Sequence, residues 1–395
     1  MKQLPNKLRT SFARWQRGFS LVELMVALVI GLIVSLAIYG ILNVNEGHRR
    51  TTTSVNDIDQ SGAYAMYQLD KAIRSAGSGF NAIEGNAGSG TGNGYGCPLN
   101  VALSGATLLP AVTAFPAPFA IVPQALVLAP TVIFSGAAGI GGDVLMAMTG
   151  SGGLGEAATA LTGPPAASNL PLVGVAGFKA NDLVLVRSSA PGSACYVEQV
   201  TSTFSPTSGT TNLPLANTYS VTPATSVASA FSLGQVPAFN LYGVGANNTL
   251  FRYDLLNPAL VSATAAGANP TVFVDNVYAM RAIYGVALSP NTISWVLPTG
   301  PTYSAASLLA GTPAANTTLK SIKAIKIALI MQSTLIEKVP AGQPGIPSQG
   351  VSSTGVVTLF TDTPPATQVI VNVAPLNVRY RVYQATIPIR NALSL

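Results

Sequence analysis

The feature that most constrains this chain is a junction between a basic leader and a long apolar run. Residues 1–17 hold five basic side chains and no acidic one. Residues 19–42 then run for 24 positions with one charge, Glu23, and no proline. A helix of that length spans the roughly 30 Å hydrocarbon core of a membrane, and the basic leader keeps the N-terminus in the cytoplasm. We therefore expect an N-terminal membrane helix that carries an exported remainder.

The single charge of the apolar run predicts a role in assembly. A carboxylate inside a membrane helix is costly and points to a function. Cleavage after Gly18 would free an amine on Phe19, four residues before Glu23. The amine of one subunit would then neutralise Glu23 of another. The alternative is an uncleaved signal anchor whose glutamate has no role.

The sequence G-F-S-L-V-E at this junction resembles the processing site of the type IV prepilins. The resemblance implies that a membrane prepilin peptidase cuts after Gly18 and methylates Phe19. It also implies that Glu23 acts in subunit assembly. The expected organisation is a leader over residues 1–18, a helix over residues 19–76 and a β-rich periplasmic or extracellular head over residues 77–395.

The net charge of the whole chain does not indicate nucleic-acid binding. The formal charge is +6, but the leader holds five of the 20 basic residues and none of the 14 acidic ones. The remainder carries 15 basic and 14 acidic residues, a net charge of +1. Bulk electrostatics therefore give a nucleic-acid partner no support.

The helix is predicted to continue past the membrane as an amphipathic segment. Between residues 51 and 76 there is no proline, and apolar or small residues recur every three or four positions. This face comprises Ile58, Gly62, Ala65, Leu69, Ile73 and Ala76, and the opposite one Asp59, Gln68, Asp70, Lys71 and Arg74. Gly77 follows as a C-terminal stop.

The rest of the chain reads as strands joined by long loops. Residues 85–96 form a glycine-rich loop, and residues 150–171 are loop by composition. Short strands are predicted at residues 119–122, 143–148, 182–186, 195–200, 248–254, 277–286, 322–331 and 376–382, with a short helix at 304–311. Single aspartates such as Asp143 are interpreted as turn residues.

The alternating strands predict which side chains share a face. In the strand at 277–286 these are Tyr278, Met280, Ala282, Tyr284 and Val286. The strand at 322–331 places Ile325, Ile327, Leu329 and Met331 together, and that at 376–382 Leu376, Val378, Tyr380 and Val382. We expect an antiparallel sheet with one buried face, covered by the helix. The predicted class is α+β, with a pilin-like long helix, transmembrane and then amphipathic, and long insertions.

The two cysteines, Cys97 and Cys195, both follow the membrane segment. An exported pair in an oxidising compartment is typical of one disulfide. The alternative is two buried free thiols. No C-x-x-C is present, so a redox site is not expected.

No constellation of catalytic residues occurs in the sequence. The single histidine, His48, lies just past the membrane segment and is interpreted as an interfacial residue. Neither G-x-S-x-G nor H-E-x-x-H nor an EF-hand loop is present. We therefore expect no enzyme activity, no metal and no cofactor.

Four further stretches, residues 66–77, 274–285, 321–334 and 380–391, resemble the PilW-type minor pilins, among them the helix end R-S-A-G and the C-terminal R-N. Residues 85–240 show no such resemblance. The resemblance implies a Gram-negative minor pilin that primes pilus assembly, serves twitching motility and adhesion, and lies at or near the tip.

The implied partners are the prepilin peptidase, the other minor pilins, the major pilin, the inner-membrane assembly platform and a large tip adhesin. The implied location is the inner membrane before assembly, with the head in the periplasm, and the cell-surface pilus afterwards. One alternative is a J-type pseudopilin of type II secretion, though these are usually about half this length. Another is a membrane-tethered receptor or enzyme.

Overall fold

A computed structural model describes residues 18–80 and 95–393, apart from 104–105, 138–141, 152–157, 166–167, 189–192, 208, 217–227, 258–268, 290–291 and 340. The chain forms two compact units, residues 1–53 and 54–395. The N-terminal helix α1 (Leu21–Ser75) begins in the first unit and ends in the second. Residues 54–75 are called the docked half of α1 below.

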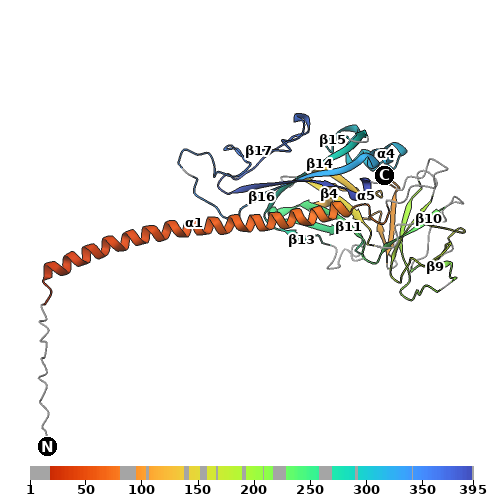
Figure 1. The fold of residues 1–395 in the computed structure, drawn as a ribbon, viewed down its shortest axis with the longest axis horizontal. Helices are drawn as coiled ribbons and strands as arrows, with labels where there is room; N and C mark the ends of the chain where they lie inside the picture. The colour runs from red at the N-terminus through yellow and green to blue at the C-terminus, as the bar shows by residue number, and fades with distance from the viewer. Residues whose placement is uncertain are drawn as a thin grey trace, which may run out of the picture. The chain divides into compact units, whose positions relative to one another are not determined.

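The head is built on a nine-stranded sheet whose main path runs β13-β12-β11-β4-β14-β16-β19 (Figure 1). Two further strands, β3 and β15, pair with β4 and β14. The bounds are β3 (Thr131–Ala137), β4 (Gly142–Thr149), β11 (Ala238–Val244), β12 (Leu250–Asp254), β13 (Thr271–Val274), β14 (Val277–Ser289), β15 (Thr292–Val296), β16 (Ile322–Gln332) and β19 (Tyr380–Pro388). Pairing is antiparallel except at β4–β14.

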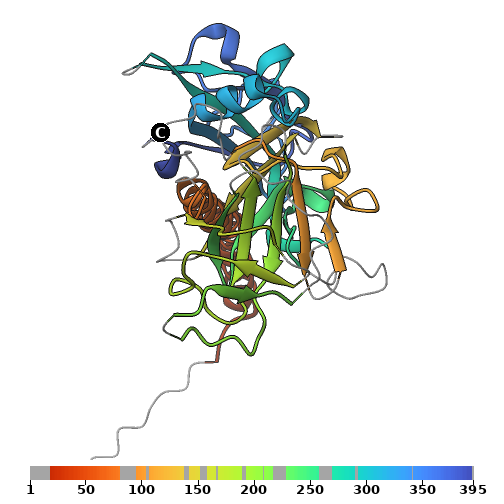
Figure 2. The ribbon, with the colours of Figure 1, turned by 90° about the vertical axis from the view of Figure 1, so that its right-hand side faces the viewer.

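The docked half of α1 lies against one face of this sheet, seen along the helix in Figure 2. The other face of β14 and β16 is buried as well, beneath the antiparallel ribbon of β17 (Val356–Leu359) and β18 (Val369–Asn372). The expectation of one buried face is therefore wrong for these central strands. Their nearly continuous apolar sequences agree with burial on both sides.

Residues between the helix and β11 build a second, six-stranded sheet, ordered β2-β1-β8-β7-β10-β5. Its strands are β1 (Leu99–Leu103), β2 (Ala106–Leu109), β5 (Thr159–Ala160), β7 (Leu183–Ser188), β8 (Cys195–Gln199) and β10 (Ala228–Gly234). The pair β6 (Asn169–Pro171) and β9 (Asn212–Pro214) accompanies it. One core cluster, from Leu170 to Ala230, belongs to this region alone. The stretch without a family resemblance thus contributes a second sheet and a core of its own.

The side chain of Asp143 links β4 to β14 in the nine-stranded sheet. β4 and β14 share one parallel pair, Gly142 with Met280. Beside it, Asp143 accepts the Ala282 N–H at 2.9 Å and lies 3.5 Å from the Arg281 guanidinium. Asp143 is 4% exposed, and burial raises the pKa of its carboxyl despite these partners. The residue interpreted as turn punctuation is therefore a buried link between strands.

The short helices differ most from the sequence prediction. Residues 119–121 form a 3-10 helix, η1 (Phe119–Ile121), rather than a strand, and they lie between prolines at 116, 118 and 123. The helix predicted at 304–311 is α3 (Ala305–Leu308), preceded by α2 (Gly300–Tyr303) and followed by α4 (Pro313–Ser321). The remaining short elements are η2 (Ala246–Asn248), η4 (Pro365–Thr367) and α5 (Arg390–Leu393).

Two strand predictions needed correction in detail. A register shift between Val277 and Ala279 puts Tyr278 in the core cluster beneath β17 and β18, called the outer cluster here. Met280 and Tyr284 belong instead to the cluster that contains the inward face of α1. The last strand, β19, begins at Tyr380 and continues to Pro388. The predicted common face of residues 376–382 is nevertheless found in the outer cluster.

Candidate assembly segment and its attachment to the head

The predicted cleavage site lies in the three described residues that precede the first helical turn. Gly18, Phe19 and Ser20 are outside α1, and Phe19 is 80% exposed. The Ser20 hydroxyl accepts the Glu23 N–H at 3.1 Å, and the Ser20 carbonyl accepts the Leu24 N–H. Ser20 is thus the N-cap of α1, which ends the non-helical junction at a defined residue.

Glu23 lies in the first turn of α1, with an exposed side chain. A negative charge there is favoured by the positive end of the helix dipole. The pattern Ser-x-x-Glu from Ser20 to Glu23 is the signature of a capping box, and it was overlooked in the sequence. The turn that displays Glu23 is therefore fixed locally by Ser20.

The apolar segment, residues 21–44, exposes all of its large side chains. It contains an 18-residue window of mean hydropathy 2.8, no part of which is buried. Within the described residues it is the one helix long and apolar enough to cross a membrane. Its surface needs lipid or other helices as a covering.

The apolar segment gives way to a polar stretch around His48. Glu46 and Arg50 form an exposed ion pair at 3.0 Å, one helical turn apart. His48 is exposed on α1, as expected for an interfacial residue. Among the described residues, no group of three or more histidine, cysteine, aspartate or glutamate side chains is arranged to hold a metal.

The predicted inward face of the amphipathic segment is confirmed. Buried along α1 are Ile58, Gly62, Ala65, Leu69 and Ile73, and Ala76 follows them in the core. At Gly62 the helix approaches β19 closely, because an added Cβ would lie 2.5 Å from Cε2 of Tyr383. Only glycine leaves room for that ring.

Asp59 does not lie on the outward face that the sequence predicts. Its carboxylate receives two donors from β19, the Arg381 guanidinium and, at 2.6 Å, the Tyr383 hydroxyl. Burial, followed by the contact with Asp59, raises the pKa of Tyr383 to about 12. The partner of Asp59 lies 322 residues away in sequence. Helical periodicity alone therefore gave no signal for this pairing.

The C-terminal end of α1 is held by residues from three parts of the chain. Gly77 has a φ of +84°, as helix-ending glycines do, and its N–H donates to the Met148 carbonyl. Thr149 Oγ1 donates to the Ser75 carbonyl at 2.8 Å. The Asn391 amide donates to the carbonyls of Ser75 and Ala76, each at 3.2 Å. The R-S-A-G and R-N stretches singled out in the sequence thus meet in space.

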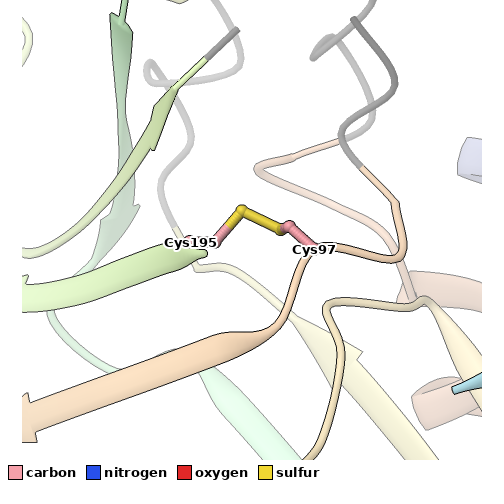
Figure 3. The surroundings of a disulfide bond; sticks show 2 residues. All are labelled: Cys97 and Cys195. Atoms are coloured by element: carbon pink, nitrogen blue, oxygen red, sulfur yellow. A yellow bond between two sulfur atoms is a disulfide. The ribbon is translucent and has the colours of Figure 1, made fainter. Parts of the chain in front are cut away.

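The predicted disulfide joins Cys97 and Cys195 (Figure 3). Cys195 opens β8, and Cys97 lies two residues before β1, which pairs with β8 in parallel. Both cysteines are buried. The bond links β8 of the second sheet to the segment that contains Tyr95 and Gly96. The remainder of the glycine-rich loop, and residues 81–84 before it, lie outside the described residues.

Comparison with known families gives two matches. The prokaryotic N-terminal methylation motif matches residues 16–39. The family described as type IV pilus-assembly protein W matches residues 241–391, which include β12–β19 and the Asp59 partners. Neither the curated proteins nor the solved structures contain a match to this chain.

Proposed function

The chain is a PilW-type minor pilin of the type IV pilus, and from that premise we propose that it primes filament assembly and lies at or near the tip. The observation that carries the proposal is α1 itself. One helix combines a fully exposed apolar segment, with Glu23 in its first turn, and a docked half fixed to the head. Such a helix is suited to insertion among other pilin helices.

Processing is the first step of the proposal. The prepilin peptidase cuts after Gly18 and methylates the new amine of Phe19. Two features support this: Gly18 has no side chain to obstruct a narrow cleft, and residues 18–20 are not helical. The mature chain is then anchored in the inner membrane, with its head in the periplasm.

Pairing of charges drives the second step. An unpaired carboxylate in the bilayer costs about 2.5–3.5 kcal/mol on insertion scales. In the proposed assembly, the Phe19 amine of one pilin neutralises Glu23 of another, which favours the helix bundle over lipid. The partners are the other minor pilins, the major pilin and the inner-membrane platform.

The size of the head supports a tip position. The second sheet and its core lie outside the part matched by the pilus-assembly family. A repeating shaft would have to accommodate this additional sheet in every neighbour, whereas a tip subunit has free space on one side. At the tip, the nearly neutral head is available to the other minor pilins or to a large adhesin.

The test compares two glutamates of the same helix. In Glu23→Ala, processing continues, but incorporation into pili and co-purification with other minor pilins are lost. The matched control is Glu46→Ala, which removes an exposed acid paired with Arg50 and preserves incorporation. Normal incorporation of the Glu23→Ala protein contradicts charge pairing. If a null strain makes normal pili but fails in type II secretion, the J-type pseudopilin replaces this proposal.

A further inference from the structure

The last part of the chain, residues 380–393, contacts both ends of the docked half of α1. It is called the C-terminal segment here. At one end, Asp59 binds Arg381 and Tyr383; at the other, Asn391 donates to the last helix carbonyls. Asp59 and Ala76 are 17 positions apart, about 26 Å along a helix. The C-terminal segment and the helix therefore run side by side in the same direction.

The C-terminal segment is itself fixed to the sheet. β19 pairs with β16 from Gln332–Tyr380 to Ala324–Pro388. Beyond the strand, the Ile389 N–H donates to the Lys323 carbonyl at 2.9 Å, and Lys323 Nζ donates to the Ala392 carbonyl. Ile387, Ile389 and Ala392 are buried in the same core cluster as the inward face of α1. Through these contacts the segment joins the helix to β16 (Figure 1).

The direction of export gives this arrangement a consequence. When the N-terminus stays in the cytoplasm, export proceeds from α1 towards the C-terminal segment, which follows residues 77–379. Until that segment arrives, Asp59 lacks both of its β19 donors, and the end of α1 lacks the Asn391 donor. The Ser75 carbonyl keeps its Thr149 donor, whereas the Ala76 carbonyl loses the Asn391 donor, and a helix-end carbonyl that loses a donor is destabilising.

We infer that the C-terminal segment is a completion element, which finishes the docking of α1 only when residues 77–379 have been exported before it. Until this segment is in place, the helix lacks these contacts with its head. The structural half of this inference stands without any pilus, whereas its consequence, that only chains with a docked C-terminal segment are assembled, rests on the proposed function. The two halves are tested by separate measurements.

Amide hydrogen exchange of the full chain in detergent micelles tests the structural half. In Asn391→Asp the side chain keeps its shape but loses the N–H donors, and it adds a negative charge at the negative end of the helix. Arg381→Ala removes a donor to Asp59. We expect exchange in residues 54–75 to accelerate roughly tenfold in both variants, because Arg381→Ala removes one charged hydrogen bond and Asn391→Asp removes two neutral ones.

The matched control is Arg379→Ala. Arg379 lies just before β19, and its ion pair with Glu337 does not involve α1. In this control we expect residues 54–75 to exchange at the same rate as in wild type. Wild-type protection in Asn391→Asp and Arg381→Ala, or equal acceleration in the control, overturns the inference.

Pili are then counted for Asn391→Asp. Loss of both helix protection and pilus incorporation supports the completion role. Loss of protection with normal incorporation overturns the assembly consequence, while failure of Glu23→Ala alone to block incorporation concerns only the proposed function.

Discussion

At the residue scale, a few small or polar side chains set how the helix meets the sheet. Gly62 admits the Tyr383 ring, Asp59 binds the donors of β19, and Asn391 caps the helix end. Each acts through a neighbour more than 300 residues away in sequence. Their roles follow from tertiary contacts rather than from local propensity, since glycine in a helix is otherwise unfavourable by about 1 kcal/mol.

Gly62→Ala is expected to destabilise the head although alanine favours helices. Its Cβ would overlap the Tyr383 ring, and overpacking of this kind costs about 1–3 kcal/mol. Gly47→Ala is the control, because a Cβ there meets nothing within 4 Å. Thermal unfolding followed by circular dichroism should show a lower Tm for the first variant and an equal or higher Tm for the second. Equal Tm values for wild type and Gly62→Ala would exclude the tight contact.

Asp143 should make a pH-dependent contribution to stability. Burial raises its folded-state pKa above the ordinary value of 3.8, so the native state binds this proton more tightly than the unfolded state. The contribution therefore favours folding at low pH and is lost as the pH rises through the folded-state pKa. In Asp143→Asn, the free energy of unfolding, measured with denaturant, should fall less between pH 4 and pH 7 than in wild type. Identical pH profiles would rule out this role of Asp143.

At the element scale, α1 packs against the nine-stranded sheet, and the disulfide links two segments of the six-stranded sheet. The inward face of α1 was predictable, because a 3.6-residue period over residues 58–73 is a local signal. Strands β4 and β16 were predictable because each is an apolar sequence of strand length, which is also a local signal. In the six-stranded sheet, β7 and β8 were predicted, but the sheet as a whole was not, since its other strands are short and β1 pairs in parallel with β8 almost 100 residues later. The α4 helix was missed because its polar sequence has little apolar period, although Thr312 and Pro313 form an N-terminal signal.

Loss of the disulfide is expected to lower the stability of the second sheet. Removal of a native disulfide typically costs about 2–5 kcal/mol, which is several degrees in Tm. Cys97→Ser and Cys195→Ser combined should melt lower than wild type, and a reductant should lower the Tm of wild type only. Non-reducing peptide mapping that finds both thiols free would remove the basis of this prediction.

At the scale of the whole molecule, the proposed function makes processing and assembly depend on the same short junction. Gly18→Val adds a branched side chain at the proposed cleavage site, so the precursor should remain uncut. Intact-mass analysis of the membrane-extracted protein is expected to show a wild-type chain that begins at methylated Phe19. The variant should retain the leader. A wild-type chain that retains Arg17 would refute the processing step.

At the same scale, the sequence signals that indicate function lie on either side of the additional sheet. The junction at residues 18–23 and the C-terminal stretches carried the family signal, and both lie inside the matched regions. The additional sheet carried no family signal, yet it forms a core of its own beside the matched part. That additional sheet is the reason why we propose a tip position.

The most direct test of the tip assignment is immunogold labelling of pili sheared from wild-type cells, with antibody against the head. We predict label at one end of the filaments and none along the shaft. The null strain serves as the control for the antibody. Label distributed along the shaft, or pili without label from cells that make the protein, would contradict the account.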